Sequence, residues 1–348
     1  MSFENHERAV QLREQYEAAA EQAPKARIRN LAAQLGVSEL ELVAAQAGDI
    51  RAIPLQTPPQ DIFRELGCLG RVMALTRNEY CVHERHGRYE DIRAGKSMGI
   101  VLGPDIDLRM FFTDWAHSWA VESGGRQSLQ FFDRAGMAVH KVYLTNESDD
   151  AGWDHLLARY TDAEPAWPVI EPLRRTSEEM LAAAPATLRE EWLAMQDTHE
   201  FFGLLKRHRV ERLTALRDVG PDLAQQVPVD TAERMLNDVA AGNIPFMCFV
   251  GNHGMIQIHS GPVKQLRRTG PWFNVLEPHF NLHLNTEAID RAWVVNKPTA
   301  DGWVTSLECF SQDGEMIVQF FGVRKPGLPE LPQWRALLES YCPIPLAA

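Results

Sequence analysis

The sequence predicts an α+β protein built from two homologous halves, each an antiparallel β-sheet with helices. Three observations support this fold class: an internal repeat, β-rich runs that follow helical runs, and a proline-rich stretch between the copies. The chain has 348 residues, more than one ordinary domain needs, and its hydrophobic content of 45% is enough to build a core. We therefore expect an N-terminal repeat over 1–164, a Pro-rich linker over 165–186 and a C-terminal repeat over 187–348.

The repeat appears when the sequence is compared with itself at an offset of 174 residues. One offset is held over more than forty residues, with a four-residue insertion in the second copy, and this indicates a duplication. The matching positions are Asn78 with Asn252, Gly87 with Gly261, VLGPDIDLRM (101–110) with VLEPHFNLHL (275–284), Trp119 with Trp293, and SLQFFDRAG from Ser128 with SLECFSQDG from Ser306.

Each copy has the same order of predicted elements. A helical lead comes first, over residues 7–46 in the first copy and roughly 187–241 in the second, with apolar residues at helical spacing. Short β-rich runs with turn signals follow. Residues 246–261 and 302–322 both have the alternation and the Gly or Asp-Gly turns of β-hairpins.

Charge and motif content exclude several classes of function. A net charge of −12 repels phosphate backbones and anionic membranes, so we expect no general nucleic-acid binding and no membrane insertion. Dinucleotide and P-loop motifs and standard hydrolase signatures are absent from the sequence. Five widely spaced cysteines without a C-x-x-C pair indicate free thiols, and the polar N-terminal stretch has no signal-peptide core. We expect a cytoplasmic protein.

Two weaker patterns leave alternatives open. Residues 28–48 have the form of a helix-turn-helix, but their few basic residues favour a helix pair that packs on its own sheet over a DNA-binding unit. His279 and His283 would share one face of a predicted strand. Two histidines without a third ligand are more often ordinary polar residues than a metal site.

Residues 192–217 (WLAMQDTHEFFGLLKRHRVERLTALR) are the most informative segment. Their spacing predicts a helix that begins near Leu188 and places His199 mid-helix, with Gly203 one turn further along the same face. Glycine inside a helix costs about 1 kcal/mol relative to alanine, so it usually has a packing reason, such as close approach of a flat group. Haem binding would need such an approach, an imidazole, apolar walls and cations. From periodicity alone, an ordinary amphipathic helix is the simpler interpretation. The candidate walls are Phe201, Phe202, Leu204 and Leu205, and the candidate cations are Lys206 and Arg212.

A resemblance to a known family changes this balance. The chain closely resembles the cytoplasmic haemin-uptake proteins of Gram-negative bacteria, the HemS/HmuS-type haemin-degrading factor family, in the same order and with the same duplication. The resemblance implies binding of haem b (haemin) in bacterial haem uptake and iron acquisition. The similar segments are DTHEFFGLLKRHRVERLTALRDVG (197–220), RNEYCVHERHGRYE (77–90), DIDLRMFF (105–112), SLQFFDRAGMAVHKVY (128–143) and VVNKPTADGWVTSLECFSQDGEMIVQFFGVRKPG (294–327).

The resemblance also implies roles for individual residues. The histidine of the family's H-x-F-F motif, which is the axial ligand of the haem iron, matches His199, and the distal arginine of its D-L-R motif matches Arg109. Because these residues belong to different copies, we expect the haem in a cleft between the halves. Phe321 stands where relatives carry a tyrosine, which puts any hydrogen bond from that hydroxyl in doubt. No catalytic residue is assigned. The further haem-pocket residues match Arg212, Lys297, Gln319, Phe321 and Arg324.

Two functions follow from the resemblance. The protein is either a carrier that takes up imported haem and passes it to a haem oxygenase, or a haem-oxygenase-like enzyme that opens the haem itself. The sequence has no flavin or nicotinamide motif, so the enzyme would need electrons from a partner reductase. An inner-membrane haem importer is the expected donor. A DNA-binding regulator built on residues 28–48 is the remaining alternative.

Overall fold

A computed structural model describes residues 3–56, 58–174, 179–324 and 327–348. The chain divides into two compact units. Unit 1 consists of residues 1–77, 84–175 and 251–257, and unit 2 consists of residues 78–83, 176–250 and 258–348. Each unit therefore takes one short segment from the other half of the sequence. Residues 175–178 of the predicted linker lie outside the described residues.

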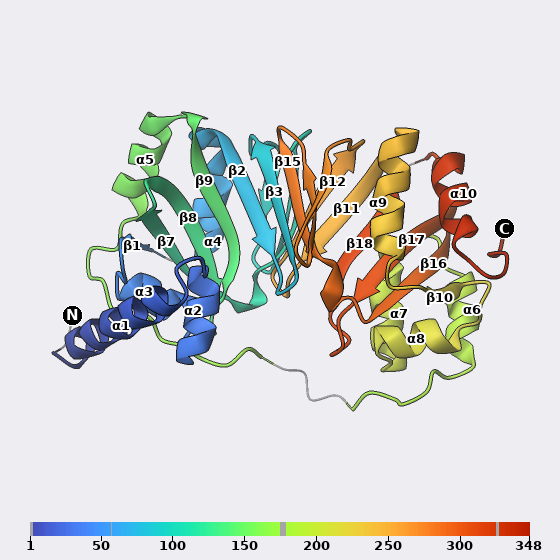
Figure 1. The fold of residues 1–348 in the computed structure, drawn as a ribbon, viewed down its shortest axis with the longest axis horizontal. Coiled ribbons are helices and arrows are strands. Elements are labelled where there is room, and N and C mark those ends of the chain that lie inside the picture. The colour runs from blue at the N-terminus through green and yellow to red at the C-terminus, as the bar shows by residue number, and fades with distance from the viewer. Residues whose placement is uncertain (1–2, 57, 175–178, 325–326) are drawn as a thin grey trace. The chain divides into compact units, whose positions relative to one another are not determined.

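The described elements of unit 1 begin with three helices and continue with strands (Figure 1). Its main sheet has the strand order β1-β7-β8-β9-β2, and a second set has the order β6-β5-β4, with antiparallel pairing in each set. The elements are α1 (Phe3–Gln22), α2 (Ile28–Leu35), α3 (Glu39–Ala44), β1 (Arg51–Leu55), α4 (Pro59–Arg64), β2 (Gly70–Arg77), β3 (Cys81–Gly87), β4 (Ile92–Ala94), β5 (Met98–Leu102), β6 (Asp107–Phe111), β7 (Trp115–Ser123), β8 (Arg126–Asp133), β9 (Ala138–Ser148) and α5 (Asp150–Tyr160).

Unit 2 repeats this order in its own residues. Its main sheet runs β10-β16-β17-β18-β11 and its second set β15-β14-β13, again antiparallel, so the predicted α+β duplication is confirmed. The elements are α6 (Thr187–Leu193), α7 (Glu200–His208), α8 (Arg212–Asp218), β10 (Ala224–Val227), α9 (Thr231–Gly242), β11 (Phe246–Gly251), β12 (Met255–Gly261), β13 (Leu266–Thr269), β14 (Trp272–Leu276), β15 (Phe280–Asn285), β16 (Arg291–Thr299), β17 (Gly302–Phe310), β18 (Met316–Gly322) and α10 (Pro332–Ser340).

The exchanged segments are held by the same bonds in both units. In unit 1 the Asn252 amide donates to the carbonyl of Val139 at 2.9 Å, and its oxygen accepts from the backbone of Gly254. In unit 2 the Asn78 amide donates to the carbonyl of Ile317 at 2.8 Å, and its oxygen accepts from the backbone of Tyr80. These residues occupy equivalent positions of the repeat, so the duplication extends to individual hydrogen bonds.

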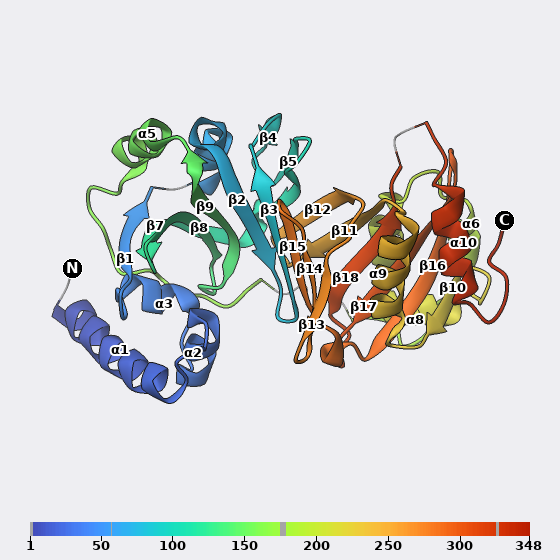
Figure 2. The same cartoon turned by 45° about the horizontal axis from the view of Figure 1, so that its top comes forward.

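The helices α1, α2 and α3 lie together in unit 1 (Figure 2). Ser38 caps α3 in a capping box with Glu41, and Gly36 ends α2 in the left-handed conformation. Leu40 and Val43 of α3 pack with sheet residues that include Trp119. The helix pair over residues 28–48 therefore packs on its own sheet, as the favoured interpretation of that segment predicted.

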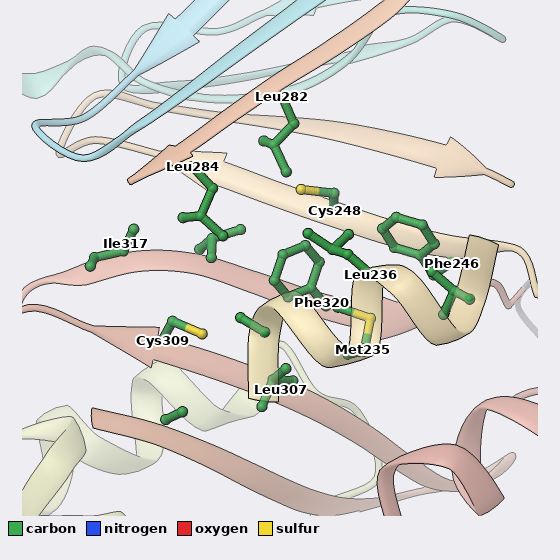
Figure 3. Packing of buried hydrophobic residues seen from close by; sticks show 14 of the residues in the cluster. Met235, Leu236, Phe246, Cys248, Leu282, Leu284, Leu307, Cys309, Ile317 and Phe320 are labelled. Carbon is green, nitrogen blue, oxygen red and sulfur yellow. The ribbon is translucent and has the colours of Figure 1, made fainter. Parts of the chain in front are cut away.

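The core of unit 2 lies on the face of the main sheet covered by α9 and α10. Met235 and Leu236 of α9 pack with the strand residues Cys248, Leu307 and Phe320 (Figure 3). The opposite face carries Trp293, Val295 and Phe310 of β16 and β17, which pack with α6, α7 and α8. Alternation along each strand thus assigns neighbouring side chains to two different layers.

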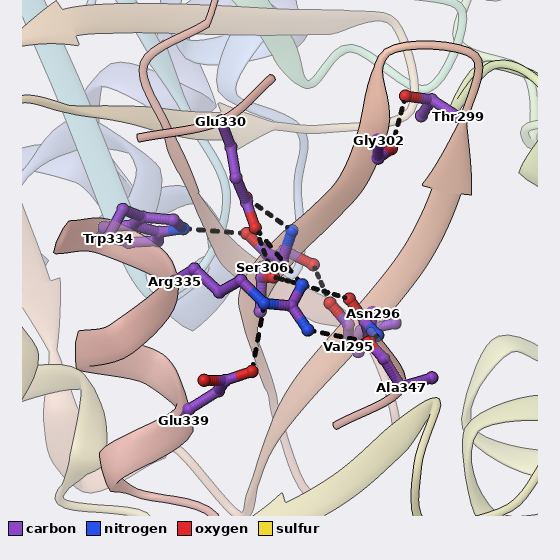
Figure 4. Close-up of polar contacts among 11 residues, drawn as sticks. Val295, Asn296, Thr299, Gly302, Ser306, Glu330, Trp334, Arg335, Glu339 and Ala347 are labelled. Carbon is purple, nitrogen blue, oxygen red and sulfur yellow. Dashed lines mark hydrogen bonds and ion pairs between the residues drawn. The ribbon is translucent and has the colours of Figure 1, made fainter. Parts of the chain in front are cut away.

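The C-terminal segment of unit 2 is fixed by a polar network (Figure 4). The Arg335 guanidinium and the Asn296 amide both donate to the carbonyl of Ala347, at 2.7 and 2.8 Å. Glu330, which is buried, accepts from the amide and the hydroxyl of Thr305. These contacts also fix the start of α10 against β17.

One expectation about the elements needs correction, and two others are confirmed. The helical lead predicted for 187–241 is interrupted by the strand β10, which pairs with β16. The predicted hairpin over 302–322 is confirmed as β17 and β18. All five cysteines are free thiols, as expected. Among the described residues, none of the helices has the length and apolar character needed to cross a bilayer.

Candidate functional site

His199 lies at the N-terminal end of α7, as its N-cap residue, and not in mid-helix as predicted. The helix breaks here because local side chains take the backbone donors that a continuous helix would use. Asp197 Oδ1 accepts from the amide of His199 at 2.9 Å, and Glu200 Oε1 accepts from the amides of Gln196 and Asp197. These bonds separate α6 from α7.

The imidazole of His199 faces solvent, with 82% of its side chain exposed. Its Nδ1 lies 2.6 Å from Asp197 Oδ1, so Nδ1 carries the proton and donates to the carboxylate. Nε2 has no hydrogen-bond partner among the described residues, so in the neutral ring its lone pair is available. A carboxylate that orients one imidazole nitrogen while the other stays free is a common arrangement for metal-ligating histidines.

Asp197 is charged in this arrangement. The amide of His199, which donates to the carboxylate, lowers the pKa of Asp197, and the His199 ring and the charge of Arg324 lower it further against the effect of burial. Arg324 therefore lies close enough to act on the same carboxylate. The structure brings two of the predicted residues, His199 and Arg324, to one end of unit 2.

A second cluster lies on the sheet face covered by α6, α7 and α8. Glu308 of β17 is fully buried and accepts two hydrogen bonds of 2.7 Å from Arg212 and one of 3.0 Å from Lys297. The Ser306 hydroxyl donates to the same carboxylate at 3.1 Å. Burial alone would raise the pKa of Glu308, but the charges of Arg212 and Lys297 lower it. Arg212 and Lys297, two of the predicted haem-pocket residues, are thus already paired with an internal carboxylate.

Phe201 connects this cluster to the start of α7. The Arg212 guanidinium lies 4.8 Å and the Lys297 ammonium 4.5 Å from the centre of its ring, so both cations contact the aromatic face. Phe201 is buried and packs edge-on against Trp192 at 4.6 Å. The side chain lies two residues after His199, and its fixed position restrains the helix end that presents the imidazole.

The expectation that four apolar residues of this segment form walls for a ligand is only partly met. Phe201, Leu204 and Leu205 are buried in the core between the helices and the sheet, so they do not face solvent. Phe202 is 76% exposed and lies three residues after His199, which places both side chains on one side of α7. Phe202 is therefore the apolar group available beside the imidazole.

Gln319 and Phe321 lie on β18, on the same sheet face as Glu308. Gln319 is directly opposite Glu308 in the strand register, and Phe321 is directly opposite Ser306. Both side chains are half-buried, and the Phe321 ring contacts Phe249 at 4.8 Å. The structure therefore places five predicted residues of the second copy, namely Arg212, Lys297, Gln319, Phe321 and Arg324, in unit 2 together with His199.

Arg109 belongs to unit 1. It lies on β6, opposite Ile100 of β5, and its guanidinium forms an ion pair with Asp107 and donates to the carbonyl of Leu108 at 3.1 Å. The side chain keeps 30% of its surface exposed. A guanidinium that uses one terminal nitrogen for two neighbours on its own strand still has donors for a further partner.

The weaker histidine pattern forms no ligand cluster. His283 Nδ1 lies 2.7 Å from Asn274 Oδ1, which occupies one ring nitrogen, and His279 lies exposed before β15. Across the described part of the chain, no group of three or more His, Cys, Asp and Glu side chains has the arrangement of a metal site.

The family described as "Haemin-degrading HemS.ChuX domain" matches the chain twice, over residues 36–160 and 209–341. The chain belongs to this family. Its two matches begin at Gly36 and Arg209, the left-handed residues that end α2 and α7, so they cover equivalent parts of the two copies.

Individual relatives of this haemin-degrading family cover almost the whole chain. The hemin transport protein HmuS of Yersinia pestis is 40% identical over 93% of this chain and 95% of its own length. The heme-binding protein PhuS from Pseudomonas aeruginosa, solved in its holo form, is 43% identical, with a TM-score of 0.91 over 96% of this chain and 99% of its own. ChuS, described as an E. coli heme oxygenase, is 36% identical, with a TM-score of 0.86 over 95% and 99%.

Sequence reasoning missed two residues of the site. Asp197 precedes His199 by two positions, and an Asp before a helix start is a known capping signal that could have indicated the break. Glu308 stands between Leu307 and Cys309 in an otherwise uncharged strand, and a charge in a buried strand is rare unless it is paired. Both signals were present in the sequence.

Proposed function

We propose that this protein binds one haem b and acts as a haem carrier in bacterial haem uptake and iron acquisition. His199 is the axial ligand and binds the iron through Nε2. The observation that carries this proposal is the exposed imidazole of His199, whose Nδ1 is held by Asp197 at 2.6 Å so that Nε2 faces outward. Relatives described as hemin transport and heme-binding proteins support it.

The surrounding residues fit an anionic, flat and apolar ligand. Phe202 offers an exposed ring beside the imidazole, and Arg212, Lys297 and Arg324 offer positive charge for the two propionates. Haem supplies iron chemistry when bound. The chain's own part is to bind and orient the group and to limit the access of water to it.

A titration of the apoprotein with haemin tests this proposal. We expect a Soret band that saturates at one equivalent, and His199→Ala should shift the ferric spectrum and weaken binding at least tenfold, because the axial bond is lost. His279→Ala is the matched control, since it removes another exposed histidine of unit 2. If His199→Ala behaves as wild type does, the ligand is another residue.

A second candidate function is haem degradation, which the relative described as a heme oxygenase favours. To test this function, the protein is loaded with haem in the absence of oxygen. Oxygen and a reductant are then added in the presence of catalase. Loss of the Soret band with stoichiometric iron release indicates an enzyme that takes electrons from a reductase. Decay that catalase abolishes is peroxide damage and supports the carrier. We place the proposed carrier in the cytoplasm. Its proposed partners are a haem oxygenase and an inner-membrane haem importer.

A further inference from the structure

Glu308 is the most deeply buried charged group of unit 2 that the haem-binding proposal does not use. Its carboxylate has no exposed surface and receives bonds from Arg212 on α8, Lys297 on β16 and Ser306 on its own strand. Gln319 lies opposite it on β18. Desolvating a carboxylate costs several kcal/mol, and such a group persists only where its charge is fully paired.

The pairing is unequal in charge. One carboxylate faces two cations, so the cluster has an excess of one positive charge, while a haem brings two carboxylates. Arg212 uses Nε and one terminal nitrogen for Glu308, and Lys297 uses one of its three donors. Arg212, whose side chain is 28% exposed, can pair with a ligand through its remaining donors without breaking the bonds to Glu308, and the buried Lys297 adds its positive charge beside it.

We infer that Glu308 is a positioning residue, which keeps Lys297 charged and Arg212 fixed for the carboxylates of the bound ligand. The inference rests on the proposed haem site and adds a role for a residue inside it. Without Glu308, Lys297 would lie 3% exposed between Arg212 and the ring of Phe201, with no carboxylate beside it. A buried lysine in that position loses its proton readily.

The titration of Lys297 gives the inference a direct readout. Burial lowers the pKa of Lys297 to about 8, against the raising effect of Glu308 and with a further lowering by Arg212. Removing Glu308 takes away the group that raises this pKa, so the pKa falls further. Lys297 should then be neutral at pH 7.5 in a Glu308→Gln variant.

The experiment compares wild type, Glu308→Gln and Lys297→Met in haemin titrations between pH 6 and 9. For wild type we expect affinity to fall as pH rises through about 8. In Glu308→Gln the midpoint of this fall moves to lower pH, and affinity at pH 7.5 drops about tenfold. Lys297→Met removes the dependence. Glu39→Gln, which removes the carboxylate of the buried Glu39–Lys141 pair in unit 1, is the matched control and keeps the wild-type profile.

The ammonium of Lys297 is also followed in the apoprotein, by NMR of lysine labelled at Cε and assigned with Lys297→Met. Its pKa should be lower in Glu308→Gln than in wild type, whether or not haemin is present. An unchanged pKa, or an unchanged pH midpoint of affinity, overturns the inference and leaves the proposed function standing. Wild type that binds no haemin overturns the proposed function. If Glu308→Gln does not fold, a pH profile of Lys297→Met equal to that of wild type overturns the inference.

Discussion

At the scale of single residues, the site depends on how one side chain orients another. Asp197 holds Nδ1 of His199 and also its backbone amide, so the carboxylate fixes both the ring and the helix end. Loss of such a partner commonly costs 10- to 100-fold in metal affinity.

We predict that Asp197→Asn weakens haemin binding by about tenfold, because an amide is a poorer hydrogen-bond acceptor than a carboxylate and holds the imidazole less firmly. The measurement is a haemin titration at pH 7.5 followed by the ferric spectrum. Asp290→Asn, which changes an exposed aspartate of the same unit, serves as control. Equal affinity in the two variants would show that the ring needs no carboxylate.

Replacing Arg109 should affect the spectrum of the haemin complex and the stability of the protein differently. Its ion pair with Asp107 is partly exposed and joins neighbours on one strand, so Arg109→Ala should cost less than about 1 kcal/mol in the free energy of unfolding. If Arg109 acts on the distal side, the ferric spectrum of the haemin complex changes. Urea unfolding and absorption spectra measure the two effects. An identical spectrum would count against the distal role.

At the scale of elements, α7 is a short helix with the proposed ligand His199 at its N-terminal end. Gly203 lies inside α7, and a methyl group there would meet only the far end of the Arg207 side chain, at 3.5 Å. A lack of room for a side chain within the protein therefore does not explain why this position is glycine.

We predict that Gly203→Ala stabilises the protein by up to about 1 kcal/mol, because alanine has the higher helix propensity. Thermal unfolding of the apoprotein measures this. A haemin titration of the same variant then asks whether the glycine leaves room for the ligand. Unchanged haemin affinity would exclude close approach of the porphyrin at this position.

At the scale of the whole molecule, the exchanged segments are the main feature. The segment Gly251–Gln257 completes unit 1: the Trp115 indole donates to the carbonyl of Gly254 at 3.1 Å, and Met255 belongs to the core. A fragment of residues 1–175 lacks this segment but contains its equivalent around Asn78.

We predict that this fragment forms a homodimer, in which each copy supplies its Asn78 turn to the place that Asn252 occupies in the intact chain. Light scattering after size exclusion should give twice the monomer mass. Asn78→Ala in the fragment should weaken the dimer, because the amide no longer donates to the partner strand. A folded monomeric fragment would contradict this prediction.

Much of the fold could be predicted because the repeat is visible when the sequence is compared with itself, and because the alternation of β17 and β18 is a local pattern. The break before His199 was missed because periodicity does not register the bonds that Asp197 makes to its own neighbours. The pairing of Glu308 with Arg212 joins residues far apart in sequence, and a strand pattern does not specify a helix partner. Strand β10 was missed because it has only four residues and is defined by its pairing with β16, which is distant in sequence.

The duplication has allowed the two copies to diverge where a symmetric dimer of identical chains could not. The first copy has a buried Glu39–Lys141 pair, whereas the second has Arg212 on Glu308, and Arg27 caps α2 where His199 caps α7. In a dimer of identical chains, every mutation appears in both subunits. After fusion of the two copies, a residue such as the proposed iron ligand His199 can arise in one half while the equivalent position of the other half changes independently.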